Sequence, residues 1–204
     1  MIVRRHLAIE EAVAGSPLTA DNNVTVLPDG ASTFRAMAEM IRGAKQSLNL
    51  EYYTIEDVDL DGDGKKLSDL LIEKRQQGVA INITYDSYGS SDTPTAFFDR
   101  LKQAGVNLLD FHPISPAQPA QAINFNARDH RKIMVADGAV GIVGGVNLSK
   151  GYESKSPGSD SDETTEAPAP VEGLTDTLGI TTKLPDQWRD TAVKIEGPAV
   201  AELQ

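Results

Sequence analysis

The chain has 204 residues, of which 40% are hydrophobic and 24% are charged, and its net charge is −11. This composition is typical of a soluble globular domain with a sizeable core. Because the chain contains no cysteine, disulfides and thiolate metal sites are excluded. The acidic balance argues against nucleic acid as the main substrate, since phosphate contacts depend on Lys and Arg.

Predicted strands and helices alternate along the chain, separated by glycine and proline turns. The apolar periodicity predicts helices over residues 3–14, 31–44, 65–77 and 94–104. It predicts strands over residues 24–27, 46–55, 79–85, 106–111, 131–136, 139–143 and 190–196. Strands that alternate with helices of this length indicate an α/β layered domain.

The composition changes after residue 150. Residues 151–173 hold six acids against Lys155, a net charge of −5, and almost no apolar side chains. Such a stretch buries too little apolar surface to offset the entropy of ordering it, so we expect a polar, acidic insertion at about 151–187.

We expect two parts in the chain. Residues 1–21 are predicted to form an N-terminal helix and linker, and residues 22–204 to form one folded lobe. Gly197 and Pro198 open a helix of which the sequence holds barely a turn and a half, so we expect more protein after Gln204. No run of about 18 apolar residues occurs, and the N-terminus is a poor signal peptide.

The most informative segment begins at His130. On a strand, His130 and Lys132 point to the same face, whereas Ile133 and Val135 are expected to face the other way, into the core. An imidazole beside an ammonium is suited to a phosphate: one group acts as nucleophile or base, and the other neutralises the anion. His-x-Lys alone is more often a surface histidine beside a solvated lysine.

The pattern around this pair is longer. It reads His-x-Lys, four residues, Asp, six residues, Gly-Gly-x-Asn, with fixed positions at His130, Lys132, Asp137, Gly144, Gly145 and Asn147. It resembles the HKD signature of the phospholipase D superfamily. The similarity to the bacterial cardiolipin synthase and phospholipase D-like branch extends over about residues 22–204, including Leu-Glu-Tyr-Tyr at 50–53, Asp-Ser-Tyr-Gly-Ser at 86–90 and Trp-Arg-Asp-Thr at 188–191.

The resemblance implies an α/β lobe with a mixed central sheet flanked by helices on both faces. It also implies that two such lobes, related by pseudo-twofold symmetry, each contribute one HKD motif to a shared site. In that scheme His130 attacks phosphorus and forms a phosphohistidine, while the partner histidine serves as general acid and then general base. Lys132 and Asn147 hold the non-bridging oxygens, and no metal or cofactor is implied.

Further residues receive more limited assignments. Asp190 matches the family's orienting carboxylate for the histidine; the alternative is an acid in a surface ion pair. Asp137 precedes a glycine in a hairpin-turn signal and is expected to be structural, together with Gly144 and Gly145. Candidate pocket residues are Glu51, Tyr53, Arg128 and Trp188. For the tyrosine and the tryptophan, core packing is the alternative.

Two other groups of charged residues are weighed. Arg131 is expected on the face opposite His130, in a buried ion pair or a substrate contact. The acidic residues Asp57, Asp59, Asp61 and Asp63 imitate a calcium loop but lack the glutamate that such a loop needs at its last position, which favours an acidic turn.

The function implied by the resemblance is phosphodiester transfer or hydrolysis on a phospholipid such as phosphatidylglycerol. The expected partners are a second HKD lobe, in the same protein or a second copy, and a membrane surface; nucleic acid is not expected. The location implied is cytoplasmic or peripheral at the inner membrane. The alternatives are a dimeric nuclease of the same superfamily and a catalytically incomplete half.

Overall fold

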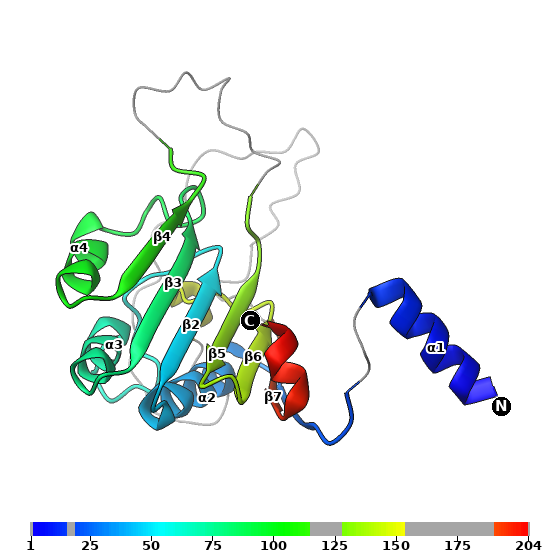
Figure 1. Ribbon diagram of the computed structural model, residues 1–204. Coiled ribbons are helices and arrows are strands. Elements are labelled where there is room, and N and C mark those ends of the chain that lie inside the picture. The colour runs from blue at the N-terminus through cyan, green and yellow to red at the C-terminus, as the bar shows by residue number, and fades with distance from the viewer. Residues whose placement is uncertain (1, 16–18, 115–127, 154–189, 204) are drawn as a thin grey trace, which may run out of the picture.

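The computed structural model describes residues 2–15, 19–114, 128–153 and 190–203 (Figure 1). Seven strands form a mixed sheet: β1 (Asn23–Leu27), β2 (Ser47–Tyr52), β3 (Ala80–Asp86), β4 (Asn107–Phe111), β5 (Lys132–Ala136), β6 (Val140–Gly144) and β7 (Ala192–Glu196). The described helices are α1 (Ile2–Ala14), α2 (Gly30–Gly43), α3 (Leu67–Gln76), α4 (Thr95–Gln103) and the short 3-10 helices η2 (Lys150–Tyr152) and η3 (Pro198–Leu203). The α/β class predicted from the sequence is confirmed, although the last helix is 3-10.

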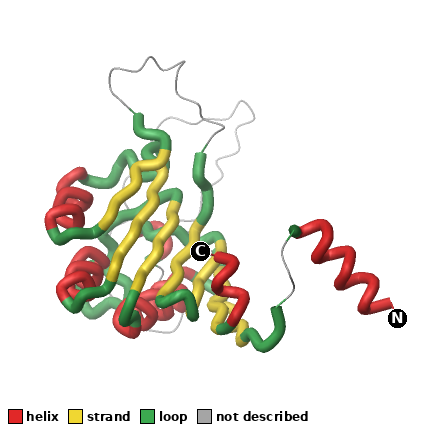
Figure 2. Tube along the Cα trace, viewed as in Figure 1, coloured by secondary structure: helices red, strands yellow, loops and turns green. Residues whose placement is uncertain are grey.

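The sheet order is β1-β7-β6-β5-β2-β3-β4. Strands β2, β3 and β4 are parallel, because α3 and α4 carry the chain back between them, whereas β5, β6, β7 and β1 are each antiparallel to their neighbours. Figure 2 shows the helices α2, α3 and α4 gathered on one side of the strands. The direction of the chain therefore reverses at β5, next to β2.

The main core lies between the sheet and α2, α3 and α4. Leu48, Leu50 and Tyr52 alternate inward along β2, and each is at most 2% exposed. Their partners on β5 are Ala136, Met134 and Lys132, so this is the face that carries Lys132.

The expectation that Ile133 and Val135 face the main core is therefore wrong. Val135 is buried separately, on the opposite face, where η3 packs; the side chain of Leu203 lies 2.9 Å from where a Cβ on Gly141 would stand. Periodicity separates the two faces of β5 but cannot say which one the helices cover, because both faces of this strand are apolar.

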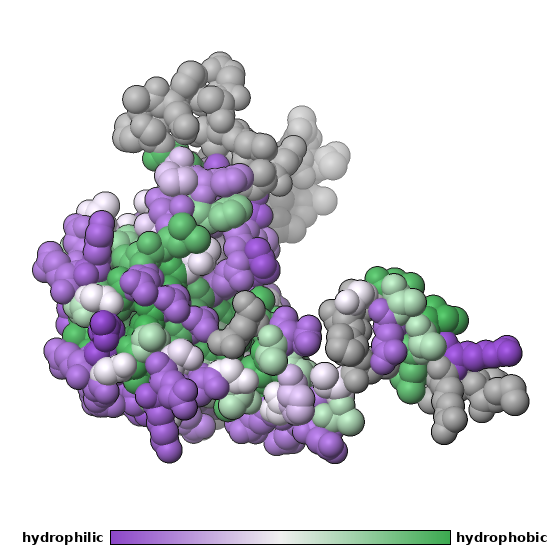
Figure 3. Space-filling view, viewed as in Figure 1, coloured by the Kyte–Doolittle hydropathy of each residue, from purple (hydrophilic) through white to green (hydrophobic). Residues whose placement is uncertain are grey.

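The opposite face of β2, β3 and β4 carries polar side chains. The amide of Asn82 donates to Asn49 Oδ1 at 2.8 Å, and the amide of Asn107 donates to Asn82 Oδ1 at 2.9 Å, so three strands share one amide ladder. No helix in the described ranges lies over this ladder. On this face of the sheet, Figure 3 shows polar residues with patches of apolar surface between them.

Helix α2 begins where the turn signal at Pro28-Asp29-Gly30 predicts. Asp29 Oδ1 accepts from the Ser32 amide at 2.7 Å, and Ser32 Oγ accepts from the Asp29 amide at 3.3 Å, which forms a reciprocal capping box. A Cβ on Gly30 would lie 2.1 Å from the carbonyl oxygen of Tyr152. Only glycine therefore lets α2 start against η2, and this contact fixes Tyr152 at the edge of the sheet.

Helix α1 stands apart from the sheet (Figure 1). Its apolar residues Leu7, Ile9 and Val13 are 43%, 60% and 79% exposed. In the part of the chain that the structure describes, every helix is too short or too polar to cross a membrane.

Candidate active site

One edge of the sheet collects the ends of four strands. Strands β2 and β6 end there, and β5 and β7 begin there, because each neighbouring pair is antiparallel. The register places Tyr52 opposite Lys132, and Gly144 opposite Ala192. Residues that are far apart in the sequence consequently meet at this edge: Tyr53, His130, Asn147 and Asp190.

His130 and Lys132 are adjacent in space, as the motif predicts. Lys132 Nζ lies 3.1 Å from His130 Nδ1 and donates to the His130 carbonyl oxygen at 2.7 Å. The ring of Tyr53 lies 4.5 Å from the imidazole, centroid to centroid, and Lys132 Nζ lies 5.2 Å from the same tyrosine ring. His130 is exposed and Lys132 is 6% exposed, so the imidazole lies at the surface beside a buried cation.

The Lys132 ammonium has its pKa lowered by burial, while the carboxylates of Asp190 and Asp129 oppose that shift. As an ammonium it can only donate, so in a neutral imidazole Nδ1 accepts and Nε2 carries the proton. Nucleophilic attack needs a ring nitrogen without a proton facing phosphorus, with the other nitrogen donating to an acceptor. An imidazole that served as a nucleophile would have to turn away from Lys132 first.

Asn147 is held from both sides at the end of β6. Its Oδ1 accepts from the Thr54 amide at 3.3 Å, and its side chain shares a hydrogen bond with the Tyr152 hydroxyl. Asn147 is 9% exposed. With the amide oxygen engaged by Thr54 and one Nδ2 hydrogen directed to the Tyr152 hydroxyl, the second N–H of Nδ2 is chemically able to donate to an anion.

Asp190 and Ala192 pack against the two glycines at the end of β6, Gly145 and Gly144. A Cβ on Gly145 would lie 2.1 Å from Asp190 Oδ1, and one on Gly144 would lie 2.5 Å from Ala192 Cα. Glycine is thus required at both positions, because a Cβ would collide with the chain at residues 190–192. Asp190 Oδ1 accepts from the Thr191 amide at 2.8 Å, and the hydrogen bonds found among residues 128–153 and 190–203 do not join Asp190 to His130.

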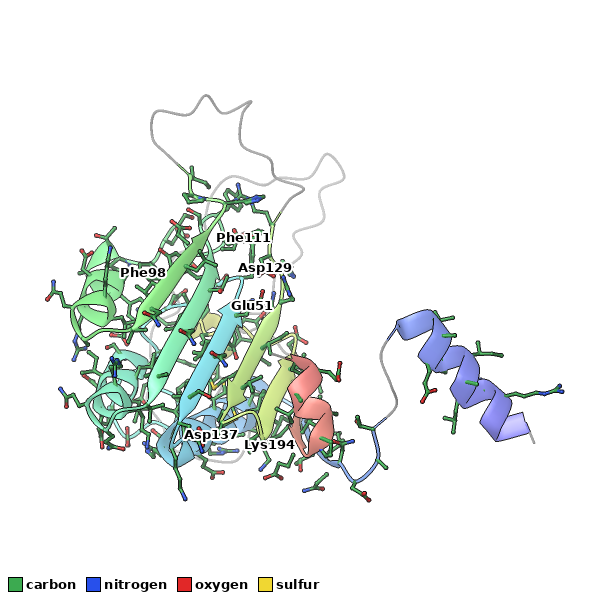
Figure 4. The ribbon with its side chains drawn as sticks, viewed as in Figure 1. Glu51, Phe98, Phe111, Asp129, Asp137 and Lys194 are labelled. Carbon is green, nitrogen blue, oxygen red and sulfur yellow. The ribbon has the colours of Figure 1, made fainter. Side chains whose placement is uncertain are left out.

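Asp137, although part of the motif, lies at the other end of β5 (Figure 4). Its carboxylate accepts from the amides of Lys45, Gln46 and Ser47 at 2.7–2.9 Å. These bonds tie the β5–β6 turn to the start of β2. Asp137 follows Lys132 by five residue steps along the extended chain, roughly 17 Å. A cavity of about 260 Å³ lies at this far end and includes Asp137 and Lys194.

Glu51 lies on the face opposite Lys132, because it precedes Tyr52 on β2 and pairs with Ile133. There it lies near Asp129 (Figure 4), and Arg131 contacts both carboxylates. Arg131 Nη2 is 3.0 Å from Glu51 Oε1, and Arg131 Nε is 3.1 Å from Asp129 Oδ1. The side chain of Arg131 is 64% exposed, so it forms an ion pair that is not buried, unlike the first of the two expected alternatives.

Burial and the neighbouring Asp129 carboxyl raise the pKa of Glu51 to about 7. The pKa of Asp129 stays below its ordinary value: burial raises it, but bonds from Glu51 and Arg131 more than offset that effect. Below about pH 7 the proton of this pair is therefore held by Glu51 rather than by Asp129. Nothing in the local sequence indicates this pairing, since it joins residues 78 positions apart.

Arg128 turns away from the histidine ring. Its side chain is 9% exposed, its Nη1 lies 3.6 Å from Asp86 Oδ1, and Nη1 donates to the His112 carbonyl oxygen at 3.2 Å. The guanidinium also lies over the ring of Tyr88, 5.5 Å from its centroid. Arg128 thus contacts a buried acid rather than a pocket. Trp188 and most of the expected insertion at 151–187 lie outside the described residues.

The acidic turn before α3 holds three carboxylates, from Asp59, Asp61 and Asp63, whose nearest oxygens lie within 4.8 Å of one another. They already have partners. Arg42 pairs with Asp61 and Asp63, and the amides of Gly62 and Gly64 each donate to Asp59 at 2.8 Å. The three carboxylates thus stabilise the turn through its own backbone amides and through Arg42.

Comparison with known proteins identifies the relatives of this chain. Residues 37–156 match the family described as "Cardiolipin synthase, PLD-like domain". The chain is 35% identical over 188 residues to cardiolipin synthase A of Pseudomonas fluorescens, covering 92% of this chain and 33% of that protein. It is 33% identical over 186 residues to the major cardiolipin synthase of Bacillus subtilis, covering 91% and 32%. The chain thus spans about a third of the length of these curated relatives.

Solved structures support the fold. A phospholipase D family member, Nuc from Salmonella typhimurium, superposes with a TM-score of 0.55 at 18% identity, covering 90% of this chain and 89% of that one. NucT from Helicobacter pylori gives a TM-score of 0.53 at 13% identity, covering 90% and 87%. Since the family match spans more than half of the sequence and contains the whole His130–Asn147 motif, this chain belongs to the cardiolipin synthase, phospholipase D-like domain family.

Proposed function

We propose that this chain carries one half of the active site of a phosphatidyltransferase that acts on phospholipids such as phosphatidylglycerol. The observation that carries the proposal is the meeting of four strand ends, which brings His130, Lys132 and Asn147 to one edge within a family match. An exposed imidazole backed by a buried ammonium is the arrangement that a covalent phosphate transfer needs.

In the first step a ring nitrogen of His130 forms a bond to phosphorus while the bond to the leaving alcohol breaks. Negative charge builds on the two non-bridging oxygens, and the Lys132 ammonium and the Asn147 amide neutralise it. Asp190 is proposed to accept a hydrogen bond from the N–H of the other ring nitrogen once the imidazole turns away from Lys132. That contact selects the reactive tautomer.

The leaving alkoxide needs a proton, and the described residues offer no second histidine beside His130. We assign that role to the histidine of a second HKD lobe, in the same protein or in a second copy. After protonating the leaving group, that histidine removes the proton of the acceptor alcohol, whose oxygen then displaces His130 from phosphorus. Water in place of the alcohol gives hydrolysis.

The names of the relatives support a phospholipid substrate, since they are cardiolipin synthases. A lipid substrate places the enzyme at a membrane surface, which we propose it meets as a peripheral protein. The net charge of −11 agrees with a lipid rather than a nucleic acid as the substrate.

The test uses a substrate whose leaving group needs no proton. A phosphatidyl ester of p-nitrophenol, in mixed micelles with a metal chelator, should release up to one equivalent of p-nitrophenol per chain in a burst. The first step then proceeds without the second histidine, and turnover stays slow because nothing activates the acceptor.

Two variants and one alternative substrate sharpen this test. His130→Asn should abolish the burst, whereas His112→Asn should keep it. A p-nitrophenyl ester of a thymidine phosphate should give a much smaller burst. A burst from His130→Asn equal to that of the unaltered chain would show that His130 is not the nucleophile. A burst seen only with the nucleotide ester would indicate that the substrate is nucleic acid rather than phospholipid.

A further inference from the structure

Asp86, the last residue of β3, is 0% exposed, and the mechanism above does not use it. Both of its oxygens are engaged. Oδ1 accepts from the amides of Tyr88 at 2.9 Å and Gly89 at 3.0 Å, and Oδ2 accepts from the amide of Asp129 at 3.1 Å. Three amides and the nearby Arg128 guanidinium together satisfy a fully buried carboxylate.

The bond to Asp129 reaches the residue immediately before His130. Strand β3 does not neighbour β5, because β2 lies between them, so Asp86 spans the end of β2 to hold the start of the motif. On the far side of His130, the amide and Nε of Arg131 both donate to Asp129 Oδ1 at 3.1 Å. The backbone on each side of the histidine is thus tied to Asp129, and Asp129 is tied to Asp86.

The turn that Asp86 closes also holds the tyrosine beside the imidazole. Ser90 Oγ donates to the Tyr53 carbonyl oxygen at 3.2 Å, and a Cβ on Gly89 would lie 2.3 Å from that oxygen and 2.8 Å from the Tyr53 ring. The Tyr53 ring in turn lies 4.5 Å from the ring of His130. Two independent routes, one through the backbone and one through the tyrosine, therefore lead from Asp86 to the imidazole.

We propose that Asp86 is the positioning residue of the His130 nucleophile. It touches no reacting atom. It acts through the Asp129 amide, the Arg128 guanidinium and the turn at Gly89 and Ser90 that contacts Tyr53. This inference rests on the proposed function, in which His130 must meet phosphorus in line with the departing oxygen. Displacing a reacting group by about 1 Å can lower a rate by roughly a hundredfold, so a rigid support has a direct effect on catalysis.

The discriminating variant is Asp86→Asn. The new side chain keeps an oxygen for the amides of Tyr88 and Gly89, but it turns an NH2 group toward the Asp129 amide and removes the negative charge beside Arg128. A matched control is Asp137→Asn, since Asp137 also accepts three backbone amides but at the opposite end of the sheet. Both variants should lower the stability of the full chain, but only the first should move the nucleophile.

Two readouts separate positioning from stability. Nuclear magnetic resonance of the full chain resolves the ring nitrogens of its three histidines, with His6 on the detached α1 as the internal reference. The second readout is the rate constant of the p-nitrophenol burst. Asp86→Asn should shift the His130 signals and slow the burst on the order of tenfold to a hundredfold. Asp137→Asn should leave the signals in place and the rate within about twofold.

If Asp86→Asn does not fold, Arg128→Gln replaces it and should act in the same direction, because it removes the guanidinium from the same network. A folded Asp86→Asn chain whose His130 signals and burst equal those of Asp137→Asn would overturn the proposal. If the unaltered chain gives no burst while Asp86→Asn still shifts the His130 signals, the positioning role stands and the proposed function fails.

Discussion

At the scale of single residues, the pair Glu51–Asp129 makes stability depend on pH near neutrality. The pKa of Glu51 is raised from 4.5 to about 7 by burial and by Asp129. A carboxyl with a raised pKa stabilises the fold in its protonated form. Its contribution is complete below about pH 4.5 and is lost as the pH rises through about 7.

Glu51→Gln should remove that dependence, because its amide donates to Asp129 at every pH. Between about pH 5 and pH 8 the unfolding free energy of the unaltered chain should fall by about 1–2 kcal/mol more than that of the variant. The limit is about 1.4 kcal/mol per pKa unit, and solvent contact reduces it. Urea denaturation of both chains measures the difference. If the unfolding free energies of the two chains change with pH in parallel, Glu51 does not hold a proton beside Asp129.

Gly145 offers a second prediction at this scale. Gly145→Ala would place a Cβ about 2.1–2.2 Å from the Asp190 carboxylate, so Asp190 must move. We expect a loss of about 1–3 kcal/mol in stability and a slower p-nitrophenol burst. Gly43→Ala is the matched control, since nothing lies within 4 Å of its added Cβ, and it should keep the burst. A burst from Gly145→Ala equal to that of the unaltered chain would show that the position of Asp190 does not affect the first step of the reaction.

At the scale of elements, the strands and helices are predictable because glycine and proline turns bound each apolar run. The motif also places His130 and Lys132 on one face of β5 from spacing alone. The sheet order cannot be read in the same way, since β5 inserts beside β2 across some 80 residues of chain. The long-range contacts of Asp86, Asp129 and Glu51 depend on that order, which is why the sequence indicates none of them.

Helix α1 is the element whose removal the fold should tolerate. It stands clear of the sheet in Figure 1, and its apolar side chains are exposed, so it contributes little buried area to the lobe. Deletion of residues 1–14 should change the unfolding free energy by less than about 0.5 kcal/mol. Urea denaturation of the shortened chain tests this, and a loss of several kcal/mol would mean that α1 packs on the lobe in solution.

At the scale of the whole molecule, charge separates the two substrate classes. With a net charge of −11, the chain should not bind duplex DNA measurably at about 10 µM protein and physiological salt, where non-specific binders have dissociation constants of about 10⁻⁴–10⁻⁶ M. Fluorescence anisotropy of a labelled duplex measures this. Micromolar binding that weakens steeply with salt would contradict this prediction and favour nucleic acid as the substrate.

His130 and Lys132 lie at the start of β5, and Asn147 follows the end of β6 at the same edge of the sheet. In the proposed function these three groups supply half of a covalent phosphate transfer, and a partner histidine protonates the leaving group. The proposed function therefore depends above all on the formation of a covalent bond between a His130 ring nitrogen and phosphorus.

The most direct measurement is to locate that bond. The chain is treated with the phosphatidyl p-nitrophenyl ester, quenched in alkali, where phosphohistidine survives, and mapped by mass spectrometry of its peptides. The account predicts a single phosphatidyl adduct on the imidazole of His130, absent from His130→Asn. An adduct on another side chain, or a full burst that leaves His130 unmodified, would contradict it.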